Sequence, residues 1–173
     1  NLNSEAEVLM MSNALTSSST AATTATALNS LDSNSTDYVA GDTILITGTK
    51  SDGTAVSTTY TYAASDTVAT LIAAINTAFS GDATASLDSS GKLILKADTS
   101  GNDKLSLTLA DNGSNTGKST WTDHTFGGST YSSSVNIFDS QGTQHTVSLR
   151  FTKQMDNEWD LTASMDSKDG TFA

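Results

Sequence analysis

The feature that most constrains this chain is an alternation of apolar and polar residues between Val135 and Met165. It runs through three stretches separated by turn residues, with Val135, Ile137, His145, Val147, Leu149, Phe151, Trp159, Leu161, Ala163 and Met165 at every second position. A side-chain period of two, broken by turns, is typical of antiparallel strands with one buried face. In the first turn, Gly142 can adopt a positive φ and Asp139 can accept backbone N–H groups. The pattern predicts a three-stranded β-meander.

Residues 38–110 have a different pattern, in which the period changes from two to that of a helix. Alternation at 43–48 and 56–62 predicts a hairpin around Asp52-Gly53, a pair that readily takes positive φ values. One helical stripe follows, formed by Val68, Leu71, Ile72, Ile75 and Phe79. Ser65 or Asp66 offers an N-cap oxygen, and Gly81 is suited to end the helix. Further short strands are expected at 83–87, 92–96 and 105–109. The order ββαβββ predicts a small α+β module whose helix covers one face of an antiparallel sheet.

The remaining segments are expected to connect these two units. Residues 1–37 are interpreted as an extended connector along the strand domain, with a short helix through Val8, Met11 and Leu15 as the alternative. A polar run at 111–119 predicts a return linker, and 121–131 a loop held by aromatic side chains. We therefore expect a mainly β fold of two domains. Residues 1–37 and 111–173 would form a discontinuous β-rich domain, and 38–110 an inserted α+β module.

Composition excludes several classes of function. The net charge of −11 argues against a nucleic-acid or anionic-membrane partner, because both require a cationic face. The chain has no cysteine, which excludes disulfides and thiolate metal sites. Residues 1–30 contain no signal-peptide core, and no apolar run in the sequence is long enough to span a bilayer. Because the first residue is Asn1, we expect the chain to be a fragment of a longer protein.

The run from Asp139 to Lys153 (DSQGTQHTVSLRFTK), followed by Asn157-Glu158-Trp159, resembles the bacterial flagellar hook protein. That family carries Asp-Ser-x-Gly-x-x-His-hydrophobic, then Phe-x-Lys, then Asn-x-Trp. The opening Asn1-Leu2-Asn3 is similar to the segment that precedes the outer domains in the same proteins.

A second resemblance lies in the predicted α+β module. Insertion modules of flagellins and hook proteins carry a Thr-x-x-x-Leu-x-x-x-Ile-Asn helix before an Ala-x-x-Asp-x-x-Gly-x-Leu hairpin. The matching residues here are Thr67, Leu71, Ile75, Asn76, Ala85, Asp88, Gly91 and Leu93. Because such modules occur in several flagellar axial proteins, this match supports the wider family rather than one member.

The resemblance implies a structural subunit of the flagellar hook, an extracellular tubular polymer that transmits motor torque to the filament while it bends. The implied partners are further copies of the same protein and other axial and hook-junction proteins. The polymerising parts of the family are terminal helices with heptad periodicity. Since no sustained heptad occurs here, we expect this chain to be monomeric in dilute solution.

The sequence contains no set of residues that predicts catalysis, a cofactor or a metal. Each of the two histidines, His124 and His145, lacks a cluster of potential ligands around it, and His145 is interpreted as a packing residue. The segment 166–170 is similar to a calcium loop but lacks the closing acidic residue, so a turn is expected. Two matches to the N-glycosylation spacing, at Asn34 and Asn112, are attributed to chance in a chain so rich in Asn and Ser.

Trp159 has two compatible interpretations. In the first, it is a core residue of the meander, packed with Phe151 and Ile137. In the second, its ring edge meets a neighbouring subunit. Both can hold together.

Two rival functions remain open at this point. One is another axial protein, such as a flagellin or hook cap. The other is a secreted adhesin or carbohydrate-binding β-module, which would present an aromatic platform or a calcium site. An enzyme is not expected, because no convergent catalytic residues can be named.

Overall fold

The computed structural model describes residues 6–100, 104–127, 130–155 and 158–166. The strands are β1 (Ala6–Met11), β2 (Thr16–Ser17), β3 (Thr20–Ala21), β4 (Asn34–Thr36), β5 (Thr43–Thr49), β6 (Ala55–Thr61), β7 (Ala83–Leu87), β8 (Leu93–Ser100), β9 (Ser106–Asp111), β10 (Lys118–Ser119), β11 (Phe126–Gly127), β12 (Thr130–Phe138), β13 (Gln144–Met155) and β14 (Glu158–Ser164). The helices are α1 (Val68–Ala78) and the 3₁₀ turns η2 (Leu28–Ser30) and η3 (Trp121–Asp123). The strand pairs are antiparallel. The predicted mainly β fold is confirmed.

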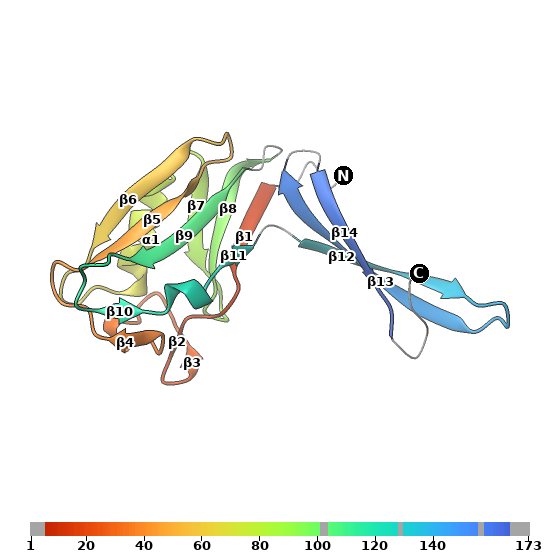
Figure 1. Ribbon diagram of the computed structural model, residues 1–173, viewed down its shortest axis with the longest axis horizontal. Helices are drawn as coiled ribbons and strands as arrows, with labels where there is room; N and C mark the ends of the chain where they lie inside the picture. Colours follow the sequence, from red (N-terminus) through yellow and green to blue (C-terminus); the bar gives the residue numbers. More distant parts are fainter. Residues whose placement is uncertain (1–5, 101–103, 128–129, 156–157, 167–173) are drawn as a thin grey trace.

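The predicted order ββαβββ is confirmed in β5, β6, α1, β7, β8 and β9, but these strands do not form one sheet. One sheet has the order β6-β5-β9, and a second has the order β11-β1-β8-β7 (Figure 1). The expectation of a single sheet was wrong because β8 is already paired on both sides, with β1 and β7. The last strand, β9, therefore pairs with β5 instead.

Helix α1 contacts both sheets, through β7 of one and β6 of the other. Its predicted apolar stripe is buried, and Leu71 and Ile75 are fully inaccessible. The side chain of Asn76 also joins the helix to edge strand β7, since its amide donates to the carbonyl of Ala85 (3.2 Å) and its oxygen accepts the Ala85 N–H (2.6 Å). The Ile-Asn…Ala part of the module motif thus has a structural reason, the attachment of helix to strand.

The helix cap lies one residue after Asp66 and two after Ser65, the two caps that the sequence predicted. Thr67 is the N-cap residue, and its N–H donates to the hydroxyl of Thr70. The predicted caps have other roles: Ser65 lies in a turn at φ +82°, and Asp66 accepts the Tyr60 hydroxyl and the Ala63 N–H. Gly81 has φ +76° after the helix, as predicted.

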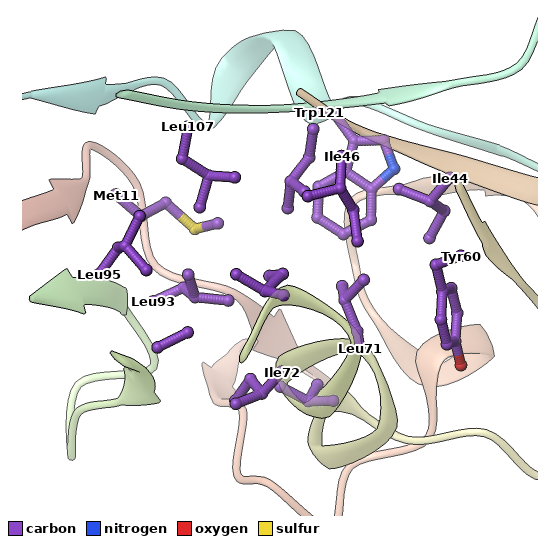
Figure 2. Packing of buried hydrophobic residues seen from close by; sticks show 14 of the residues in the cluster. Met11, Ile44, Ile46, Tyr60, Leu71, Ile72, Leu93, Leu95, Leu107 and Trp121 are labelled. Carbon is purple, nitrogen blue, oxygen red and sulfur yellow. The ribbon is translucent and has the colours of Figure 1, made fainter. Parts of the chain in front are cut away.

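A single apolar core lies between α1 and the two sheets. Figure 2 shows side chains from α1, β5, β8 and η3 pointing into the same interior. Met11 and Leu15 from the N-terminal segment and Trp121 from η3 are buried in the same cluster. The core therefore unites segments that are more than 100 residues apart in the sequence.

Strand β1 (Ala6–Met11) takes the place of the helix through Val8, Met11 and Leu15 that was the alternative for the N-terminal segment. β1 pairs with β8, which lies in the predicted insertion, and also with β11. β4 pairs with β10, and both β10 and β11 lie after residue 110. The described part of the N-terminal segment thus shares sheets with strands from both predicted domains, and pairs with no strand of the meander. The division into domains at residues 37/38 and 110/111 itself stays a prediction.

Two carboxylates fasten the segment before β5 to the segment after β9. The Asp42 carboxylate accepts the backbone N–H groups of Val39 (3.0 Å), Thr116 (3.0 Å) and Gly117 (2.7 Å). Asp111 accepts the hydroxyl of Tyr38, the indole N–H of Trp121 (3.1 Å) and the N–H of Ser119 (2.7 Å). Burial and the neighbouring Asp111 raise the pKa of Tyr38, which keeps it protonated and able to donate.

This fastening requires a glycine at position 117. A Cβ atom there would lie 2.4 Å from the Cα and 2.6 Å from the N of Tyr38, both of which are backbone atoms. We predict that Gly117→Ala lowers the free energy of unfolding by about 1–3 kcal/mol, because the two backbones must separate. Urea denaturation followed by Trp121 fluorescence measures this. Gly113→Ala is the matched control, because a Cβ at Gly113 meets nothing within 4 Å; equal stability of the two variants would contradict the prediction.

The Asp42 carboxylate also predicts a pH dependence. The N–H groups of Val39, Gly117 and Thr116 hold the pKa of Asp42 below its usual range. A lowered folded-state pKa means that the stabilisation is fully present above the unfolded pKa, about 3.9, and is lost as the pH falls through the folded pKa. We therefore expect Asp42→Asn to lower the melting temperature at pH 7 and to reduce the loss of stability between pH 4 and pH 2. Thermal melts across this range test it, with Asp37→Asn, an exposed position, as control. An unchanged acid slope in Asp42→Asn would refute the assignment.

Candidate interaction surfaces

The predicted meander is confirmed as a separate three-stranded sheet of order β12-β13-β14, which projects away from the core in Figure 1. Gly142 has φ +83° in the β12–β13 turn. The Asp139 carboxylate accepts the N–H groups of Gln141 and Thr143, each at 2.8 Å. Both turn residues therefore do what the sequence indicated.

The apolar face of this sheet is largely uncovered. In register across it lie Tyr131, Phe151 and Leu161, then Ser133, Leu149 and Ala163, then the pair Val135 and Val147. Val147, on the central strand, is 7% exposed, whereas Val135 is 47% and Leu161 56% exposed. The prediction of one buried face was wrong, because a period of two shows that a face is apolar but does not provide an element to cover it.

Trp159 does not pack with Ile137. Trp159 pairs with Lys153 and Ile137 pairs with His145, so the two side chains lie eight residues apart along β13, about 26 Å. Trp159 is half-buried and has contacts of its own. Its predicted neighbour Phe151 is two residues from Lys153 in β13 and contacts Tyr131, with ring centroids 6.1 Å apart.

The opposite face of the sheet is polar apart from Phe138 at the end of β12, and it forms an open groove of about 640 Å³. Its side chains come in two cross-strand rows, Ser132–Arg150–Thr162 and Ser134–Ser148–Ser164. The sequence analysis did not single out these residues. They occupy the polar positions that alternate with the apolar ones in the same pattern. The sequence signal that could have identified them is an arginine, Arg150, whose neighbours on this face are Ser and Thr.

Both histidines are engaged in local structure. The Nε2 of His145 lies 3.3 Å from an Asp139 carboxylate oxygen at the base of the β12–β13 turn. The Thr143 N–H and His145 both lower the pKa of Asp139. His124 is buried, with Nδ1 3.1 Å from the carbonyl oxygen of Asn13. The two residues are thus in separate parts of the structure and do not converge on one site.

The remaining sequence candidates give no binding site within the described residues. Among them no group of three His, Cys, Asp or Glu residues could hold a metal ion. The predicted turn at 166–170 lies outside the described residues after Asp166. The Asn34 amide donates to the Leu28 carbonyl (2.7 Å), and the Asn112 oxygen accepts the Ser114 N–H (3.1 Å). No helix in the described ranges is long and apolar enough to cross a membrane.

The uneven coverage of the apolar face leads to a prediction. Val135 and Val147 are cross-strand partners on one face, yet one is exposed and the other buried. We expect Val147→Ala to destabilise the β12–β13 pair by about 1–2 kcal/mol. Val135→Ala should change it by less than about 0.5 kcal/mol. Native-state hydrogen exchange of the β12 and β13 amides measures local opening. Equal effects would mean that both side chains are covered in solution.

A protein-family model matches the part of the chain that contains the meander. Residues 114–172 match the family model described as the flagellar basal body protein FlaE D2 domain. The match spans β10, η3, β11 and the whole meander, and it includes the run 139–153 and the Asn157-Glu158-Trp159 segment of the hook-protein resemblance. Searches of curated proteins and of solved structures give no match. Residues 114–172 are therefore similar to the FlaE D2 domain, and this match supports a structural protein of flagellar hook type.

Proposed function

We propose that the chain is the outer, non-helical part of a flagellar hook subunit, in an extracellular tube that bends while it transmits torque. The observation that carries the proposal is the D2 domain match over residues 114–172. The partners would be copies of the same protein and other axial and hook-junction proteins, as the resemblance implies. No catalytic role is assigned to any residue.

The surface of the meander supports a role in protein contacts. Four large apolar residues on one face of this sheet are between 42% and 56% exposed: Tyr131, Val135, Ile137 and Leu161. Exposed apolar side chains gathered on one element mark interaction surfaces. The other face carries hydroxyl groups, which exchange hydrogen bonds with water and with a neighbour at low cost. A subunit whose contacts must be remade during bending needs surfaces of this second kind.

The solution behaviour of the chain gives a first test. Stable complexes bury about 800 Å² per partner and are centred on well-packed apolar side chains. The exposed face of one three-stranded sheet offers a smaller area than this. We therefore predict that the 17.9 kDa chain sediments as a monomer at micromolar concentration. The full-length protein that carries it should polymerise. Sedimentation velocity measures both, and a tight oligomer of the chain alone would contradict the prediction.

The location of the protein separates the main proposal from its rivals. Gold-labelled antibodies raised against this chain should decorate the short curved segment at the base of the flagellum in electron micrographs. Label along the filament or at a growing tip would instead indicate a flagellin or a hook cap. Label over the cell envelope, together with glycan or calcium binding in titrations, would favour an adhesin. Only the first result agrees with a hook subunit.

A further inference from the structure

The polar groove of the β12-β13-β14 sheet is built around the single arginine of the sequence. Arg150 lies at the centre of a cross-strand row, between Ser132 and Thr162. The next row on the same face consists of Ser134, Ser148 and Ser164. The guanidinium therefore stands on the middle strand, surrounded by hydroxyl groups, in a groove of about 640 Å³.

The Arg150 side chain is exposed and makes no hydrogen bond or ion pair within the described residues. The hydroxyl neighbours cannot neutralise its charge. Asp160 lies diagonally across the face, beside Thr152, and has an interaction of its own. A guanidinium presents a planar fork of donors that matches a carboxylate in two parallel hydrogen bonds. Flanking serine and threonine hydroxyls can donate to the remaining lone pairs of the same carboxylate.

We propose that this groove binds a carboxylate side chain of a second copy of the chain. The proposal rests on the proposed function, since it names a contact within the polymer. Charge complementarity selects the partner: the sequence has 19 acidic and 8 basic residues, so two copies repel each other unless their few cations face carboxylates. Within the part of the chain that the structure describes, two carboxylates are available. Asp37 and Asp123 are exposed, and their side chains make no polar contact within the described residues.

An exposed ion pair between two copies is weak by itself. It contributes when other parts of the polymer already hold the copies side by side, because the effective concentration is then high. Such a contact can break and form again as neighbouring subunits shift. The groove would therefore orient one subunit on the next without locking them together.

The test uses polymerisation of the full-length protein that carries this chain. Arg150→Glu should raise the critical concentration for polymerisation by about fivefold or more, because an attraction becomes a repulsion. Lys96→Glu is the matched control: it makes the same change in charge at an exposed strand residue of the other sheet, and should have little effect. Adding Asp37→Arg or Asp123→Arg to Arg150→Glu should restore assembly in one of the two pairs. High salt should reduce the difference between wild type and Arg150→Glu.

The outcomes separate this inference from the proposed function. Failure of the wild-type protein to polymerise would count against the proposed function. Normal assembly of Arg150→Glu, or its loss with no rescue by either reversed aspartate, would overturn the inference and leave the proposed function intact. Circular dichroism checks folding, and Arg150→Gln, which keeps a polar side chain, replaces Arg150→Glu if that variant unfolds. Binding of inorganic phosphate to wild type but not to Arg150→Gln, with equal assembly of both, would assign the groove to a small anion and overturn the inference too.

Discussion

Burial of the α1 stripe between two sheets is the interaction on which the larger part of this structure depends. Leu71 and Ile75 can be removed from water only if β6 on one side and β7 on the other are both in place. The sheet that contains β7 is completed by β1 from the start of the chain and by β11 from beyond residue 120. The helix is thus stable only when distant segments have come together, and the core forms as one unit.

At the edge of that unit, the chain is held together by hydrogen bonds to carboxylates. Asp42 and Asp111 bind backbone N–H groups and two aromatic donors, and hold the beginning of β5 near the chain that leaves β9. Buried polar groups are satisfied in this way because an unpaired N–H costs more than the bond contributes. Gly117 belongs to the same arrangement, since the backbones approach too closely for any side chain. Some of the acidic residues that give the chain its negative charge therefore have a structural role, because their carboxylates accept hydrogen bonds from the backbone.

The projecting sheet has no comparable core. Val147 on the central strand is buried, but Val135 and Leu161 on the outer strands are exposed to solvent. One face is apolar and the other carries hydroxyl groups with Arg150 among them. For a subunit of flagellar hook type, a sheet with two chemically different exposed faces is suited to contacts with neighbouring molecules, which is the role proposed here.

Local chemistry was predictable from the sequence wherever it depends on neighbouring residues. The order ββαβββ, the helical stripe, the β-meander and the positive φ angles of Gly81 and Gly142 follow from period and turn residues, which act over a few positions. Only the tertiary structure decided which strands from distant parts of the chain pair. In the structure, β1 pairs with β8, and β9 pairs with β5 in the other sheet. Trp159 and Ile137 lie at distant positions along β13. Pairing between distant segments depends on which apolar faces can be covered together, and alternation records that a face is apolar without recording what lies against it.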